Sequence, residues 1–123
     1  MLAGLAMGCQ PSEANAVKQG MIKVAIMYPN ETEAGFDMDY YKTSHMPMLA
    51  ELFGEKLVSY EIDSGLSGRT ADEQAMYVAI GYLYFNQLSD YQNGFQEYGE
   101  QILSDIPNYT TIRPIVQISK VVK

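Results

Sequence analysis

Cysteine, histidine and basic side chains are scarce in this chain of 123 residues. The single cysteine, Cys9, excludes an internal disulfide and a cysteine-rich zinc site. The chain has eight lysine and arginine residues and 15 acidic ones, and the basic residues form no cluster. The attraction to phosphate that supplies most nonspecific nucleic-acid affinity is therefore missing. No stretch approaches the roughly 20 apolar residues of a membrane span. We therefore expect no nucleic-acid partner, and contact with a membrane only through an N-terminal lipid.

Several enzyme classes lack the residues that they would need. Gly65 and Gly68 stand alone after a predicted strand, without the following helix N-terminus that a phosphate-binding loop requires. Residues 21–123 contain no cysteine nucleophile, and although Ser44 adjoins the one histidine, His45, nothing identifies a hydrolase triad. No two candidate ligands stand at metal-binding spacing around that histidine. We therefore predict no metal site.

Residues 1–20 differ from the rest of the chain and are expected to lie outside the fold. Their apolar start ends in Leu5-Ala6-Met7-Gly8-Cys9, which resembles the cleavage box of bacterial lipoproteins, followed by a polar tether. Cleavage there would make Cys9 a lipidated first residue in the bacterial envelope. However, Ala6 stands where leucine is usual, and no basic residue precedes the apolar run. The alternatives are translation from Met21, which would leave the protein in the cytoplasm, or a disordered extension.

Residues 21–123 predict a single domain with the element order βαββαβ. Asp37 is the expected N-cap of the first helix and Gly54 its end, and Ser89 with Gln92 predicts a capping box at the start of the second. Two split βαβ halves predict a ferredoxin-like α+β fold, a four-stranded antiparallel sheet with both helices on one face. The strands are expected at 22–28, 57–63, 76–85 and 115–122, and the helices at 37–53 and 89–106.

The two central strands of that sheet are apolar on both faces. Residues 76–85 carry no charge, and residues 22–28 carry only one. Leaving their large side chains in water would forgo about 1.5–3 kcal/mol each and expose an apolar patch. Since no third layer remains in the sequence, we expect a second copy to cover the open face in a homodimer. Residues 1–20 are the alternative lid, although their second half is polar.

His45 is the first chemical candidate. It lies two residues before Pro47, which cannot donate to the Thr43 carbonyl, so the helix should kink there. Kinks of this kind often line a cavity, and an imidazole with a pKa of about 6.5 exchanges protons near neutral pH. The alternative is a hydrogen-bonded core histidine, because His45 shares an apolar helical stripe with Tyr41 and Leu49.

Three segments of residues 21–123 closely resemble the EthD family. They are the strand at 21–28, Phe36-Asp37-Met38-Asp39-Tyr40-Tyr41 leading to His45-Met46-Pro47, and Asp105-Ile106-Pro107-Asn108-Tyr109-Thr110 before Pro114-Ile115-Val116. The resemblance implies a dimeric α+β barrel with a largely apolar pocket between sheet and helices in each protomer. Similar barrels include cofactor-free isomerases, decarboxylases or dehydratases, and monooxygenases, so we expect no cofactor, and the fold does not choose the reaction.

Such a pocket suggests roles for the residues around His45, which would be its general acid or base. Tyr41, one turn earlier, is the expected hydrogen-bond partner, with Tyr40 beside it. Asp39 could orient the imidazole only if the kink turned the two together, since a spacing of six places them on opposite sides of a regular helix. Its alternative role is that of a solvated acid favoured by the helix dipole.

Other candidate substrate contacts lie on the third strand and before the fourth. Tyr82 and Tyr84 share one strand face and could bind a carbonyl or phenol oxygen, or merely pack their rings. Gly81 between them marks a bulge, a close approach by ligand or relief of crowding against a helix. Arg113 could clamp a substrate carboxylate, or lie exposed beside Pro114.

Two functions are compatible with these residues. The first is a cofactor-independent enzyme of lyase, isomerase or oxygenase type that acts on a small apolar cyclic or aromatic compound, with His45 as general acid/base. The second is a non-catalytic protein that binds a small ligand, or an accessory protein of a degradation pathway. A His45→Ala protein separates the two, since loss of turnover with ligand binding retained would support the enzyme.

Overall fold

The computed structural model describes residues 17–123, so the predicted lipidation at Cys9 and most of the expected tether lie outside the described residues. The element order βαββαβ is confirmed, with the first helical stretch divided into three pieces. Short 3-10 turns follow the two helical stretches at Gly54–Lys56 and Ile106–Asn108. The strands are β1 (Ile22–Pro29), β2 (Leu57–Ser64), β3 (Tyr77–Phe85) and β4 (Ile115–Lys120), and the helices are α3 (Met38–Tyr40), a π-helical turn (Tyr41–His45), α4 (Met46–Phe53) and α5 (Leu88–Asp105).

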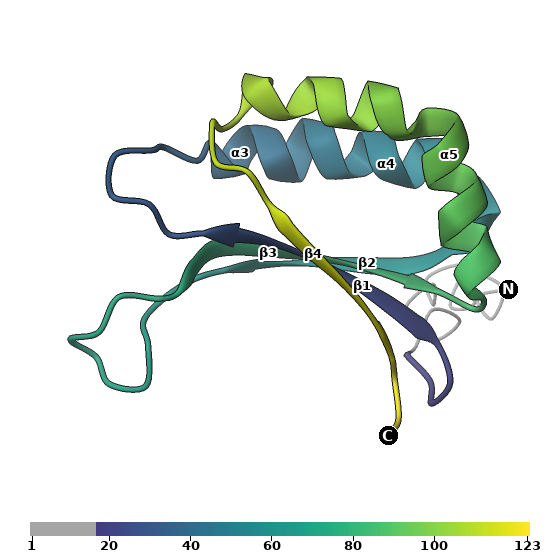
Figure 1. The fold of residues 1–123 in the computed structure, drawn as a ribbon, viewed down its shortest axis with the longest axis horizontal. Helices are drawn as coiled ribbons and strands as arrows, with labels where there is room; N and C mark the ends of the chain where they lie inside the picture. Colours follow the sequence, from purple (N-terminus) through teal and green to yellow (C-terminus); the bar gives the residue numbers. More distant parts are fainter. Residues whose placement is uncertain (1–16) are drawn as a thin grey trace, which may run out of the picture.

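The four strands form one antiparallel sheet in the order β2-β3-β1-β4. Both helical stretches lie on the same face of this sheet, α4 and α5 running across it as a second layer (Figure 1). This arrangement confirms the predicted ferredoxin-like α+β fold. The two central strands, β1 and β3, supply the sheet's part of the core, where Val24, Leu83 and Phe85 are almost completely buried.

Strand register determines what the open face of the sheet contains. On β1 and β3 the opposed pairs there are Met27 with Ile80, Ala25 with Tyr82 and, toward one end, Lys23 with Tyr84. The outer strands add polar residues to the same face, because residues opposed across antiparallel strands share a side. Those polar neighbours are Glu61, Asp63, Gln117 and Ser119. The open face is therefore an apolar centre framed by polar edges, and less uniformly apolar than β1 and β3 alone predict.

The first helical stretch changes its hydrogen bonding where the sequence predicts a kink. The Asp37 carboxylate caps it by accepting from the backbone N–H of Tyr40 at 3.1 Å, as expected. In the next turn the N–H of Met46 donates to the carbonyl of Tyr41, a π-helical bond across five residues. Pro47 follows directly and has no N–H to continue an α-helical ladder through Thr43. Gly54 then ends α4 with φ of +61°, also as expected.

The start of α5 differs from the prediction. Gln87, with extended backbone (φ −139°, ψ 149°), occupies the N-cap position and its side chain makes no capping hydrogen bond. Because the helical conformation already begins at Leu88, Ser89 lies inside the helix and the predicted capping box is wrong. The inward face is nevertheless the expected one, and Phe95 and Ile102 pack against the core.

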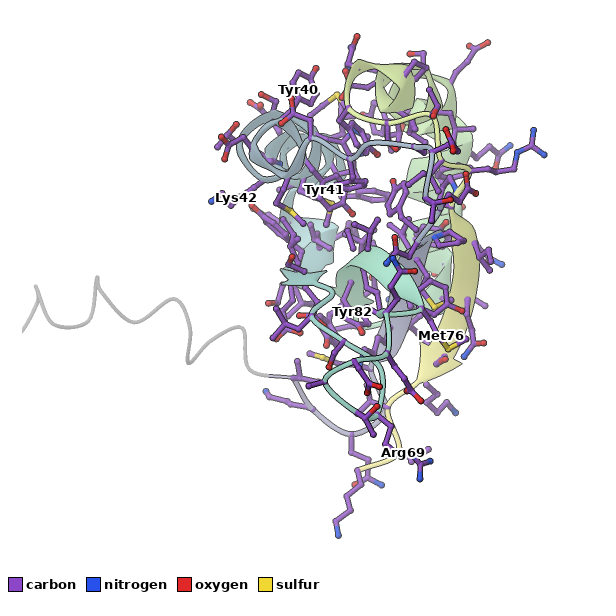
Figure 2. All side chains as sticks on the ribbon, turned by 90° about the vertical axis from the view of Figure 1, so that its left-hand side faces the viewer. Tyr40, Tyr41, Lys42, Arg69, Met76 and Tyr82 are labelled. Carbon is purple, nitrogen blue, oxygen red and sulfur yellow. The ribbon has the colours of Figure 1, made fainter. Side chains whose placement is uncertain are left out.

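Gly81 lies where the sheet and the π-helical turn approach most closely. A Cβ atom at this position would clash with the Tyr41 hydroxyl oxygen and stand 3.2 Å from Cε of Met46. Strand pairing with β1 continues through Gly81 without a register shift, so it marks no bulge. Of the alternatives for this glycine, relief of crowding against a helix is confirmed. Figure 2 shows Tyr41 between the helices and the sheet.

We predict that Gly81→Ala lowers the free energy of unfolding by about 1–3 kcal/mol, because overpacking forces the tyrosine or the strand to move. The Tyr41 hydroxyl is buried and has no hydrogen-bond partner among the described residues. Tyr41→Phe should therefore be neutral or stabilising, and the glycine substitution should cost less in that background. Denaturant unfolding of the two single variants and the double variant measures the coupling. An equal cost of Gly81→Ala in both backgrounds would contradict the assigned contact.

Candidate functional site

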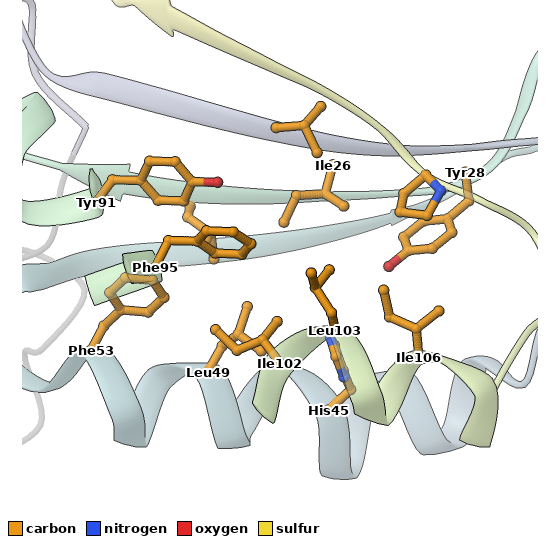
Figure 3. A pocket seen from close by; sticks show the side chains of 13 residues that line it. Ile26, Tyr28, His45, Leu49, Phe53, Tyr91, Phe95, Ile102, Leu103 and Ile106 are labelled. Carbon is orange, nitrogen blue, oxygen red and sulfur yellow. The ribbon is translucent and has the colours of Figure 1, made fainter. Parts of the chain in front are cut away.

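A cavity of about 70 Å³ lies between the sheet and the two helical stretches. Its wall is almost entirely aliphatic and aromatic, and none of the described residues that line it is lysine, arginine, aspartate or glutamate. Among the lining residues within 17–123, only His45, Tyr28 and Tyr91 have polar side-chain atoms (Figure 3). The remaining lining residues are Ile26, Leu49, Phe53, Leu83, Phe95, Ile102, Leu103, Ile106, Pro114 and Val116.

The cavity is small for a ligand site, since such sites usually enclose about 300–1,000 Å³. Leu103 and Val116 at its boundary are 52% and 48% exposed. These two residues, with Ile106 and Pro114, also line an open surface depression of about 580 Å³. The cavity and the depression thus share a wall of four side chains.

The π-helical turn places His45 at the inner end of the site. His45 is only 3% exposed. Its ring stacks on the Tyr41 ring, with centroids 5.6 Å apart and an interplanar angle of 16°. The Tyr109 ring lies 4.6 Å away on a tilted plane. Figure 3 shows the imidazole directed from the helical layer into the cavity. Two aromatic neighbours therefore fix the orientation of the imidazole.

Asp105, the last residue of α5, holds the imidazole from the other side. The Nδ1 atom of His45 lies 2.8 Å from Oδ2 of Asp105. The second carboxylate oxygen accepts from the Tyr40 hydroxyl at 2.8 Å and from the Asn108 amide at 2.9 Å. A carboxylate at a helix C-terminus faces the negative end of the helix dipole, and these three donors offset that cost.

Protonation follows from this geometry. Burial raises the pKa of Asp105, but the hydrogen bonds from His45, Asn108 and Tyr40 outweigh it and leave the pKa below 3.8. Burial lowers the pKa of His45 below 6.5, although the Asp105 hydrogen bond and charge act in the opposite direction. At pH 7 the carboxylate is ionised and the imidazole neutral, so Nδ1 carries the hydrogen. Nε2, which has no hydrogen-bond partner among residues 17–123, then carries the lone pair.

The structure brings only some of the predicted site residues together. Tyr41 stacks on His45, but its hydroxyl points at Gly81 rather than at a ligand, and Tyr40 binds Asp105. Neither tyrosine lines the cavity. Tyr41 contacts the imidazole ring itself, and Tyr40 contacts the carboxylate that binds the imidazole. Asp39 is exposed, as the solvated-acid alternative predicts. Its backbone carbonyl accepts a hydrogen bond from the Thr43 hydroxyl.

Tyr82, Tyr84 and Arg113 do not line the cavity beside His45. The two tyrosines project from the opposite face of β3, where Nζ of Lys23 lies 4.5 Å from the centre of the Tyr82 ring. The Tyr84 hydroxyl donates to Glu61 on the neighbouring strand. The strand register therefore separates Tyr82 and Tyr84 from the cavity beside His45, and their contact with a substrate stays a prediction. Arg113 is exposed and lines the outer depression.

Sequence reasoning missed Asp105 as the partner of the histidine. The two residues are sixty positions apart, and no local spacing connects them. The available signal was the segment Asp105-Ile106-Pro107-Asn108, which combines a carboxylate with an amide donor at the predicted end of a helix. Within residues 17–123 no three histidine, cysteine, aspartate or glutamate side chains gather as a metal site would require. No helix in that range has the length and apolar character needed to cross a bilayer.

No protein-family model matches the chain, and no curated protein matches it. The crystal structure of an EthD-like protein from Ralstonia eutropha JMP134 superposes with a TM-score of 0.82 at 38% sequence identity, covering 86% of this chain and 96% of that one. An EthD family protein from Bacillus halodurans C-125 gives a TM-score of 0.57 at 12% identity over 81% and 97% of the two chains. A candidate monooxygenase from Shewanella loihica PV-4 gives a TM-score of 0.54 at 11% sequence identity, covering 87% of this chain and 99% of that one.

The sheet, its helical layer and the apolar cavity define a ferredoxin-like α+β protein. The chain belongs to the EthD family, as 38% identity across most of both chains shows. This confirms the resemblance seen in the sequence. The two similarities near 12% identity support the fold alone.

We predict that the imidazole of His45 titrates below pH 6.5 and that Asp105→Asn lowers its pKa further, because the substitution removes the charge that favours the protonated ring. Since His45 is the only histidine, its ¹⁵N and ¹H resonances can be followed by NMR without assignment. The same spectra should show hydrogen on Nδ1 and none on Nε2 near neutral pH.

Asp39→Asn is the matched control for this titration, since Asp39 is exposed and does not contact the imidazole. It should leave the midpoint unchanged. A midpoint that rises in Asp105→Asn, or one that both variants shift equally, would rule out the assigned pairing.

Proposed function

We propose that this protein is a cofactor-independent enzyme of lyase, isomerase or oxygenase type, acting on a small apolar cyclic or aromatic compound with His45 as general acid/base. The observation that carries the proposal is the His45–Asp105 pair at the edge of an apolar cavity. The similarity of the chain to an EthD-like protein is compatible with small-molecule chemistry, but it does not specify a reaction.

The pair suits proton transfer in both directions. Nε2 of the neutral imidazole would take a proton from an acidic C–H or O–H of the bound compound. The resulting imidazolium would be stabilised by the ionised carboxylate at Nδ1, 2.8 Å away. The ring could then return the proton at another atom of the substrate, or to a departing group. Exclusion of water strengthens the attraction between imidazolium and carboxylate.

The lining of the cavity supports an uncharged substrate. Aliphatic and aromatic side chains favour a ring through burial of apolar surface. A charged substituent inside the cavity would have no side chain of opposite charge among the described lining residues, and burying an unpaired charge is costly. Any acidic substituent would have to extend outward, toward the depression that Arg113 lines.

A non-catalytic protein that binds a small ligand, or acts as an accessory protein in a degradation pathway, is the second candidate. It rests on the same apolar cavity beside His45, whose small volume limits a bound ligand and a substrate alike. In that case His45 would hold a ligand by a hydrogen bond to Nε2 and transfer no proton.

His45→Gln should reduce turnover by about 10²–10⁴-fold while retaining ligand binding, because proton transfer is lost and the polar shape is kept. Turnover and binding are measured on a panel of lactones, quinones and phenols. Lys42→Gln, an exposed substitution in the same π-helical turn, should behave like the native protein. Full turnover in His45→Gln would refute the catalytic role, and binding without turnover by the native protein would support the second candidate.

We also propose that two copies pair through their open sheet faces. Met27, Ile80 and Tyr82 form the apolar centre of this face, and the helices of the same chain lie on the other side. Pairing would remove that centre from water and cover it on both copies at once around a two-fold axis. The resemblance to the EthD family carried by the sequence implies the same dimeric barrel.

Sedimentation at micromolar concentration should therefore give the mass of a dimer, and Ile80→Lys should give a folded monomer. The introduced lysine would lie opposite Asp63 on the neighbouring strand, which favours folding of the single chain, while an interface would bury its charge. Leu66→Ser, in the β2–β3 loop and 93% exposed in the native chain, is the control that should remain dimeric. A native protein that sediments as a monomer would refute the pairing.

A further inference from the structure

Tyr91 is the polar residue of the cavity whose role the proposed proton transfer leaves open. It lies in the first turn of α5 and lines the cavity with His45. Its ring stacks against Phe95 at 5.8 Å and Phe53 at 6.2 Å, and packs on a tilted plane against Phe85 at 5.7 Å. Three aromatic neighbours therefore fix the direction of the ring, and with it the position of its hydroxyl group.

The hydroxyl of Tyr91 is unengaged, in contrast to the other tyrosine hydroxyl at the cavity. The Tyr28 oxygen lies 2.6 Å from the Tyr109 oxygen, so each already has a partner. Tyr91 makes no hydrogen bond to any residue in the described part of the chain. Figure 3 shows its oxygen directed into the cavity. Burial raises the pKa of Tyr91, so the phenol stays protonated and can donate or accept.

The two free polar groups lie at different ends of an apolar space. Figure 3 shows Tyr91 with Phe53 and Phe95 at one end, and His45 with Tyr28 at the other. The side chains between them carry no polar atom; they are Ile26, Leu49 and Ile102. A ligand that satisfies both groups must therefore have polar atoms at its ends and an apolar body between them.

We propose that Tyr91 is the specificity-determining residue of this site and selects neutral ring compounds that carry a hydroxyl or carbonyl oxygen at the end remote from the proton that His45 exchanges. This inference rests on the proposed function, because it takes the cavity beside His45 as the ligand site. A hydroxyl group fits the Tyr91 end, whereas a carboxylate there would be buried without an opposite charge among the described lining residues.

A matched pair of probes tests the proposal: acetophenone, whose carbonyl and acidic methyl group suit the His45 end, and 4-hydroxyacetophenone, which adds a hydroxyl at the far end of the ring. Binding is followed through the NMR signals of the only imidazole, which report occupancy at the His45 end. The native protein should bind the hydroxylated probe about three- to tenfold more tightly, as one net hydrogen bond provides.

Tyr91→Phe removes only the hydroxyl and keeps the stacked ring, so it should reduce this preference to less than about twofold and leave the affinity for acetophenone unchanged. Tyr98→Phe, on the same helix but outside the cavity, should keep the full preference.

The outcomes separate this inference from the proposed function. If both probes shift the His45 signals and Tyr91→Phe retains the full preference, the role of Tyr91 is overturned while the cavity stands as the ligand site. If neither probe shifts those signals at millimolar concentration, the ligand site beside His45 is overturned, and the selection by Tyr91 falls with it.

Discussion

The hydrogen bond between Nδ1 of His45 and Oδ2 of Asp105 is the interaction on which the site depends. It joins the π-helical turn to the end of α5, two segments that are sixty residues apart in sequence. The carboxylate also collects donors from Tyr40 and Asn108, so one side chain ties three parts of the helical layer together. The same bond assigns the hydrogen to Nδ1 and leaves Nε2 toward the cavity, which makes the arrangement chemically directional.

Burial and pairing act on His45 in opposite senses, and their balance gives the residue its chemistry. The apolar cavity disfavours the charged ring, while the carboxylate stabilises it. A histidine that was only buried would resist protonation, and one that was only paired would stay charged near neutral pH. The combination gives a neutral base whose protonated form has a partner already in place.

The sequence predicted the order of elements, the side of each helix that faces the core and the disturbance near Pro47, because periodicity, caps and proline act over a few residues. It did not predict the partner of His45. Asp39 is closer in sequence, but helix geometry directs it outward, and the pairing with Asp105 exists only after α5 has packed beside α4. Contacts of this kind are set by tertiary packing, which no local pattern encodes.

Alternation along β3 showed that Tyr82 and Tyr84 share a face and that Leu83 lies on the other, but it could not show which face meets the helices. Gly81 decides this in the folded protein, since only a strand face without a side chain at that position admits Tyr41. The capping prediction at Ser89 failed for a similar reason. The backbone leaving β3 is still extended at Gln87, so the helix begins one residue before the motif that sequence favoured.

The π-helical turn makes the site sensitive to chain length as well as to side-chain identity. Each residue of an α-helix advances the side-chain direction by about 100°, and the wide turn at Tyr41–His45 holds one residue more than a regular turn would. Loss of a single residue from this turn would let the helix close regularly and rotate everything before it by more than a quarter of a circle. Tyr40 would then swing away from α5 while His45 kept its place. In this segment a one-residue deletion is therefore a larger structural change than most substitutions, and the spacing between Asp37 and Pro47 itself determines how His45 and Tyr40 meet Asp105.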